Sequence, residues 1–126
     1  MNRSIVGLVG ASGFVGSACL SALSSIAEVH PIKTPRFTST ARTAADAYGE
    51  IDQAIARRFG ERHLSGVDVL VNAAGLATAA STDLDALVGA NALLPLFLLK
   101  AAESVGVQRL VHISTAAVQG RGNLDE

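Results

Sequence analysis

The fold of this chain is set by seven residues near the amino terminus, Gly10-Ala11-Ser12-Gly13-Phe14-Val15-Gly16. A short apolar run rich in β-branched residues precedes them at 4–9, and apolar residues at helical spacing follow from Phe14 to Ile26. Glycines without a Cβ allow a tight turn, a close approach to a ligand and close packing of the helix on the strand. Free N–H groups and the positive end of the helix dipole would face that ligand. The turn therefore predicts a nucleotide-phosphate site; without the flanking strand and helix, an ordinary tight turn would explain it equally well.

Strands and helices alternate along the rest of the chain. Further strands are predicted at 29–32, 68–72 and 109–113, and helices at 44–59 and 84–105. Asp83 or Thr82 would cap the long helix, and Gly106 would end it. Pro31 is unusual inside a strand. This alternation predicts an α/β fold of three layers, with a doubly wound parallel sheet between helices.

Length, charge and cysteine content exclude several classes of protein. The 126 residues suffice for one domain, here 1–126, and the net charge of −1 gives no sign of nucleic acid or an anionic membrane as partner. Cys19 is the single cysteine, so an internal disulfide is excluded and a cytoplasmic location is expected. The apolar stretch 84–105 contains Asn91, Pro95 and Lys100, which favours a buried core helix over a membrane span.

Four ordered motifs resemble the extended short-chain dehydrogenase/reductase family, which includes nucleotide-sugar epimerases, dehydratases and reductases. The first is the Gly-x-x-Gly-x-x-Gly turn, and the second is Asn72-Ala73-Ala74-Gly75 after a predicted strand. The third is Asn91 within a helix, and the fourth is Val-His-Ile-Ser-Thr-Ala-Ala-Val-Gln-Gly at 111–120. The last two together are most similar to dTDP-4-dehydrorhamnose reductases. The resemblance covers essentially the whole chain, is weakest at 34–66, and implies an NAD(P)-binding Rossmann fold.

The resemblance also implies roles for individual residues. The turn at 72–75 would line the ribose and nicotinamide side of the cofactor. Thr115 would take the catalytic hydroxyl position and donate a hydrogen bond to the reacting oxygen of the substrate; the alternative is a strand-end threonine that satisfies local backbone groups. The implied cofactor-binding residues are Gly10, Ser12, Gly13, Phe14, Val15, Gly16, Asn72, Ala73, Ala74, Gly75 and Ser114.

Asn91 is expected to be a buried amide in the active-site region, because it shares a helix stripe with Leu87, Leu94 and Leu98. Pro95 lies four residues later and has no N–H, so in a regular helix the Asn91 carbonyl would lose its usual donor. Our hypothesis is that this carbonyl holds a water molecule in a proton relay. A proline kink satisfied by solvent is the alternative.

The segment after the second predicted strand bears on the choice of cofactor. NAD-specific sites place Asp or Glu about 20 residues past the glycines, where it binds the ribose 2′-hydroxyl. Here the segment 30–36 contains no acidic residue, but it carries Lys33 and Arg36. Two cations suit a 2′-phosphate, which predicts NADP in preference to NAD. The alternative is that both are solvated loop cations and that the choice is made elsewhere.

The sequence departs from the family at its catalytic tyrosine. The family's proton donor lies in Tyr-x-x-x-Lys, a spacing that places both side chains on one helix face. Tyr48 is the single tyrosine here, and Asp52 rather than lysine lies four residues later. The usual third strand is also not recognisable. We therefore expect an incomplete Rossmann domain, truncated on its C-terminal side and inactive alone.

Two functions remain open from the sequence. The first is the NAD(P)-binding part of an oxidoreductase, epimerase or dehydratase that acts on a nucleotide-linked sugar by hydride transfer. The second is a non-catalytic dinucleotide-binding module, such as a redox sensor or an assembly partner. The first is favoured, because Thr115 and Asn91 would have no purpose in a pure binder. An incomplete sheet would leave an open edge, so self-association or poor solubility is expected.

Overall fold

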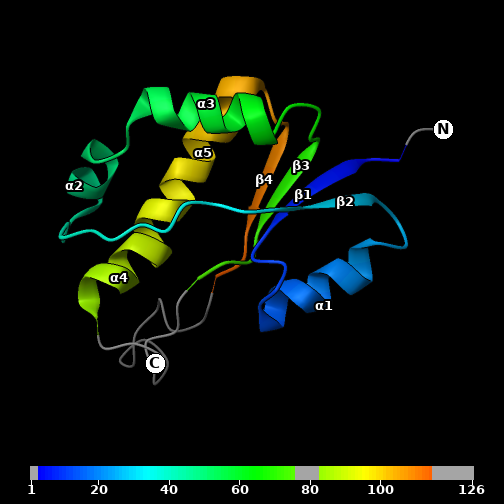
Figure 1. The fold of residues 1–126 in the computed structure, drawn as a ribbon, viewed down its shortest axis with the longest axis horizontal. Helices are drawn as coiled ribbons and strands as arrows, with labels where there is room; N and C mark the ends of the chain where they lie inside the picture. Colours follow the sequence, from blue (N-terminus) through cyan, green and yellow to red (C-terminus); the bar gives the residue numbers. More distant parts are fainter. Residues whose placement is uncertain (1–2, 76–82, 115–126) are drawn as a thin grey trace, which may run out of the picture.

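The chain forms an α/β fold around a four-stranded parallel sheet. The computed structural model describes residues 3–75 and 83–114. The strand order is β2-β1-β3-β4, with all neighbours parallel. The strands are β1 (Ile5–Val9), β2 (Glu28–Ile32), β3 (Val69–Asn72) and β4 (Arg109–His112). Because all four run in the same direction, their carboxyl ends meet at one edge of the sheet (Figure 1).

Helices cover both faces of the sheet, which confirms the predicted three layers. Helix α1 (Phe14–Leu23) packs on one face, where its Leu20 and Leu23 lie against the buried cluster that contains Val6 and Leu8. The opposite face carries α3 (Gln53–His63) and α5 (Leu94–Val105) (Figure 1). Side chains on a strand alternate between faces, so the buried central strands supply both cores.

Pro31 lies in β2, which has β1 as its neighbour in the described sheet. An edge strand tolerates proline because the missing N–H is not needed by a second neighbour.

Helix α1 ends at Leu23, three residues before the predicted Ile26, whose side chain is 71% exposed. The hydroxyl of Ser24 hydrogen-bonds to the Leu20 carbonyl at 2.6 Å, a local bond that competes with further helix.

The single helix predicted at 44–59 is wrong, because two helices occupy this stretch. They are α2 (Ala44–Gly49) and α3, which begins at Gln53. The first helix ends at Gly49, and Asp52 caps α3, since its Oδ1 accepts hydrogen bonds from the N–H groups of Ala54 at 3.0 Å and Ile55 at 3.2 Å. The capping preference of aspartate outweighs the four-residue apolar spacing that predicted one helix.

The long helix predicted at 84–105 forms with a wide turn in its middle. It consists of α4 (Leu84–Val88), the π-helical turn η2 (Gly89–Leu93) and α5. The η2 turn ends immediately before the first turn of α5, which holds Pro95, and the N–H of Leu94 bonds to the Gly89 carbonyl. A π turn accommodates the missing donor of a proline without breaking the helix.

Both predicted ends of this helix can be compared with the structure. Asp83 is the N-cap, and its Oδ1 accepts from the N–H of Ala86 at 3.2 Å; Thr82 lies outside the described residues. Gly106 ends the helix in the left-handed conformation with φ 73°, as predicted.

By length and composition alone, Leu84–Val105 could cross a membrane, but the core helices of soluble proteins also meet this criterion.

Helix α5 forms the main core together with α3. A Cβ on Gly60 of α3 would lie 2.5 Å from the Ala101 carbonyl oxygen, so the two helices touch backbone to backbone at this glycine. Phe59 and Phe97 make an edge-to-face contact, with ring centroids 5.2 Å apart.

No strand forms between Ile32 and Val69, a stretch that is described throughout. Instead, residues 33–43 leave the end of β2 and cross in front of the α4–α5 helix (Figure 1). At the other side of the described sheet, β4 pairs with β3 and has no second neighbour. Its Val111 is 40% exposed.

Candidate functional site

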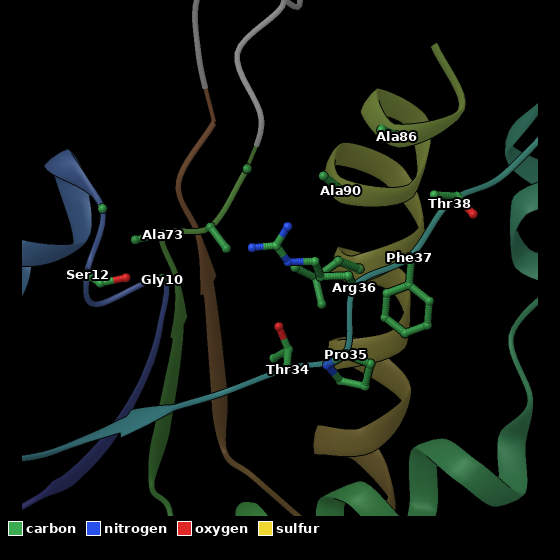
Figure 2. A pocket seen from close by; sticks show the side chains of 14 residues that line it. Gly10, Ser12, Thr34, Pro35, Arg36, Phe37, Thr38, Ala73, Ala86 and Ala90 are labelled. Carbon is green, nitrogen blue, oxygen red and sulfur yellow. The ribbon is translucent and has the colours of Figure 1, made fainter. Parts of the chain in front are cut away.

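A cleft of about 570 Å³ opens at the carboxyl ends of β1 and β3 (Figure 2). From β1 the chain crosses first to β2 and later to β3 on the opposite side, so the strand order reverses at this point. Open α/β sheets bind ligands at such a switch point. The lining residues are Gly10, Ser12, Gly13, Thr34, Pro35, Arg36, Phe37, Thr38, Ala73, Ala74, Gly75, Ala86, Ala90 and Leu94.

Two of the three motif glycines are required by the packing of the chain itself. Gly10 has φ 83°, and a Cβ on it would lie 2.6 Å from the backbone nitrogen of Ala74. A Cβ on Gly16 would lie 1.7 Å from the Gly10 carbonyl oxygen. Gly10 thus brings the loop against the turn after β3, and Gly16 brings α1 against the loop.

Gly13 is different, because a Cβ there would meet the Gly10 carbonyl oxygen at 3.5 Å, an ordinary contact. The chain therefore does not need a glycine at this position for its own packing. Gly13 lines the cleft and is the N-cap of α1, where no side chain accepts a hydrogen bond from the first turn. Helix N-termini with free N–H groups attract anions, so the backbone of this loop suits a phosphate.

Phe14 and Val15 are the first residues of α1, and their side chains are exposed. The Phe14 side chain is 94% exposed, and neither residue lines the cleft. Their backbone N–H groups lie in the first turn of α1, at the helix end that attracts anions.

The turn after β3 forms another wall of the cleft with Ala73, Ala74 and Gly75. Asn72 stands behind this wall and is 1% exposed. Its Oδ1 accepts a hydrogen bond from the N–H of Ala74 at 3.1 Å, and its Nδ2 lies 3.2 Å from Nδ1 of His112. Asn72 therefore shapes the turn from behind and does not line the cleft itself.

The two predicted cations behave differently. The guanidinium group of Arg36 extends into the cleft toward Ala73 (Figure 2). Lys33 is exposed and does not line the cleft. Arg36 is thus the residue that the structure brings together with the glycine turn.

The segment that carries Arg36 is held against the α4–α5 helix at several points. The N–H of Ser39 donates to the Asp85 carbonyl at 3.0 Å, and Arg42 forms an ion pair with the Asp85 carboxylate at 2.8 Å. A Cβ on Gly89 would lie 1.9 Å from the Phe37 carbonyl oxygen, so the segment rests directly on the helix backbone. These contacts set the position from which Arg36 enters the cleft.

The predicted catalytic residues are only partly placed. Asn91 is exposed, not buried as expected; its Oδ1 lies 3.1 Å from where a Cβ on Gly75 would be. It lies within η2, so the regular helix assumed for the relay hypothesis is absent there. Ser114 is exposed and follows β4 without lining the cleft, and Thr115 lies outside the described residues.

Sequence reasoning missed the apolar wall of the cleft. Ala86, Ala90 and Leu94 line it from the α4–α5 helix, and Phe37 lines it from the segment after β2. The four-residue spacing of small residues before Leu94 was a usable signal for a helix face that a flat ligand could approach.

A tyrosine–lysine pair does exist, but neither residue lines the cleft. Nζ of Lys100 lies 4.8 Å from the ring centroid of Tyr48, an exposed side chain on α2. Hydrogen bonding to Lys100 lowers the pKa of Tyr48, and the same contact raises the pKa of Lys100. This pair joins α2 to α5 and does not supply the family's proton donor to the cleft.

The NAD dependent epimerase/dehydratase family matches residues 6–126. The chain belongs to this family. No curated protein matches the chain significantly. The matched residues contain the glycine turn at the end of β1 and the sheet with strand order β2-β1-β3-β4.

Solved structures with the same fold are longer than this chain. A mutated uronate dehydrogenase is 27% identical with a TM-score of 0.64, and the match covers 91% of this chain and 40% of that protein. A UDP-N-acetylglucosamine 4-epimerase from Methanobrevibacter ruminantium, in complex with UDP-N-acetylmuramic acid, is 19% identical with a TM-score of 0.66 and coverages of 95% and 40%. A UDP-glucuronic acid 4-epimerase from Bacillus cereus, in complex with NAD, is 20% identical with a TM-score of 0.60 and coverages of 93% and 42%. The chain thus spans about 40% of the length of these relatives.

Proposed function

We propose that this chain is the NAD(P)-binding part of an enzyme that acts on a nucleotide-linked sugar by hydride transfer. The observation that carries the proposal is the cleft at the switch point, where the Gly10–Gly13 loop, the turn at 73–75 and Arg36 meet. Membership of the epimerase/dehydratase family supports it. So do the relatives, whose names include a uronate dehydrogenase and two UDP-sugar epimerases.

The residues of the cleft suit a dinucleotide. The loop from Gly10 to Gly16 would hold the pyrophosphate, since Gly13 lines the cleft and has no side chain that would intrude on a ligand. The segment 34–38 and the apolar wall would hold the adenosine end, and the turn at 73–75 the nicotinamide ribose. The nicotinamide ring supplies the site with a group that takes up or gives a hydride.

We further propose that NADP is preferred over NAD. Arg36 offers a planar cation inside the cleft, and no acidic residue lies between His30 and Thr38 to select a free ribose 2′-hydroxyl. The Bacillus cereus relative was solved with NAD, so the preference proposed here concerns the residues of this chain. It rests on Arg36; Lys33 does not line the cleft.

Thr115 and Asn91 are proposed to act on the substrate side of the cofactor, and Ser114 is proposed to bind the cofactor itself. Asn91 supports this by its position beside Gly75, at the end of the cleft wall. Thr115 would donate a hydrogen bond to the reacting oxygen. Because the described residues contain no Tyr-x-x-x-Lys pair, the 126-residue chain alone is expected to bind cofactor without turnover.

Isothermal titration of the 126-residue chain with NADPH and NADH tests the proposal. We expect both to bind, with NADPH about tenfold tighter, as one charge-assisted contact provides. Binding of neither nucleotide would contradict the assignment of the cleft. Equal affinities, or tighter binding of NADH, would contradict the NADP preference and leave the nucleotide site standing.

A further inference from the structure

The hydrogen bonds of Asn72 determine the state of the histidine beside it. The N–H of Ala74 is a backbone donor, so the Asn72 atom that faces it at 3.1 Å must be the carbonyl oxygen. The amide nitrogen of Asn72 then faces Nδ1 of His112 at 3.2 Å, and an amide nitrogen can only donate. Nδ1 of His112 must therefore accept, which requires a neutral ring with its proton on Nε2.

This pair lies directly behind the nucleotide cleft. Asn72 and His112 are partners in the parallel register of β3 and β4. Ala74 is pressed against the glycine loop, because a Cβ on Gly10 would lie 2.6 Å from the Ala74 nitrogen. A rotation of the buried Asn72 amide would therefore break its hydrogen bond to Ala74 and change the position of the turn that lines the cleft.

We propose that His112 is a positioning residue of the cleft: its neutral ring fixes the Asn72 amide, and the amide fixes the turn at Ala74. The inference deepens the proposed nucleotide binding and rests on it for its consequence. When His112 is protonated, Nδ1 carries a hydrogen and can no longer accept. If the Asn72 amide keeps its orientation, two donors meet at His112; if it flips, two donors meet at the N–H of Ala74. No orientation satisfies both contacts, so protonation loosens the turn.

No charged neighbour in the described part of the chain takes over this role. The buried Asn72 and the exposed His112 lie on the sheet face that also carries Leu70 and Leu110, two residues of the core formed with α3 and α5. The helix that covers this face has no charged side chain from Gly89 to Leu99, and Lys100 contacts Glu103 and Tyr48.

The remaining charged groups near this end of the sheet are also engaged or directed elsewhere. Arg36 extends into the cleft, and Arg109 lies three residues earlier on β4, on the opposite face by strand alternation. Among the described residues no carboxylate forms an ion pair with His112. Histidine is the side chain that ordinarily changes charge between about pH 5 and 8, so pH is the variable that tests the contact with Asn72.

A ligand-free measurement tests the positioning itself. In ¹H–¹⁵N spectra of the 126-residue chain recorded from pH 8 to pH 5, the Ala74 amide signal should shift with the same midpoint as the His112 ring. In His112→Gln the side-chain oxygen accepts from Asn72 at every pH, so the Ala74 signal should stay at its high-pH position. An Ala74 amide that stays constant while the His112 ring titrates would overturn the proposal.

Binding of NAD⁺ tests the consequence for the site, since its phosphodiester charges do not titrate in this range. The dissociation constant should rise about tenfold from pH 8 to pH 5.5 in the unmodified chain and remain nearly flat in His112→Gln. His30 and His63 remain in both proteins, so a pH dependence that persists in His112→Gln would assign it to them and contradict the proposal. Absence of NAD⁺ binding at pH 8 would instead contradict the nucleotide site, and the ligand-free spectra would still decide the role of His112.

Discussion

Gly16 stands so close to Gly10 that a Cβ on Gly16 would lie 1.7 Å from the Gly10 carbonyl oxygen. The same turn contains Gly13, where a Cβ would meet that oxygen at 3.5 Å. Gly16 is therefore needed for the chain to pack, whereas Gly13 leaves room beside the cleft. This difference separates the structural part of the motif from the ligand-binding part.

Gly16→Ala is expected to destabilise the fold by about 3 kcal/mol, because helix α1 must move away from the turn to relieve the overlap. Urea unfolding followed by circular dichroism measures this loss as a lower midpoint. An unchanged midpoint would show that α1 is not seated on Gly10 in the way the structure describes.

Gly13→Ala is the matched control in the same turn. Its backbone, with φ −78°, is open to any residue, so unfolding should change by no more than about 0.5 kcal/mol, the cost of alanine at an N-cap. Cofactor affinity should nevertheless fall about tenfold, since the added methyl group occupies the approach to the helix N-terminus. Unchanged affinity for both NADPH and NADH would place the pyrophosphate elsewhere.

Arg36→Ala is expected to weaken NADPH binding about tenfold and to leave NADH binding nearly unchanged. The reason is that Arg36 extends into the cleft, where we propose that it binds the 2′-phosphate that NADPH has and NADH lacks. Lys33→Ala removes the same charge from an exposed position outside the cleft and should change neither affinity by more than about twofold. If Lys33→Ala has the larger effect, the cation that selects the cofactor has been assigned wrongly.

Gly89→Ala tests how the segment with Arg36 is held. A Cβ on Gly89 would lie 1.9 Å from the Phe37 carbonyl oxygen, so the segment 34–38 must shift away from the helix. We expect a loss of about 2 kcal/mol in stability and a smaller ratio of NADPH to NADH affinity. Gly49→Ala is the control, because a Cβ on Gly49 would meet nothing within 4 Å and its φ is not positive. Its stability should be equal or slightly higher.

Local patterns predicted those parts of the fold that local chemistry determines. The glycine turn, the strand before Asn72 and the left-handed cap at Gly106 are each specified by a few neighbouring residues. The division at Asp52 and the π turn before Pro95 were missed, because a cap and a proline competed there with a regular apolar spacing.

The candidate site was predictable on one side only. The glycine loop and the turn at 72–75 are sequence motifs, whereas the opposite wall exists because the backbone at Phe37 rests on Gly89. That contact joins residues 52 positions apart and leaves no periodic signal. For the same reason the sequence could not separate Arg36 from Lys33, which differ in direction and not in charge.

The open side of β4 leads to the last prediction, that the isolated chain self-associates. In the described sheet β4 has β3 as its one neighbour, and Val111 is 40% exposed on it. Unpaired strand edges with apolar side chains pair with other chains. Light scattering across a concentration series should therefore show a mass above 12.9 kDa that rises with concentration. Val111→Lys places a charge on this strand and should lower the apparent mass, as lysines on natural edge strands do. Ile26→Lys, a charge added at a position between α1 and β2 that is 71% exposed, is the control and should not lower it. A monodisperse monomer at high concentration would show that β4 is protected in the chain as it stands.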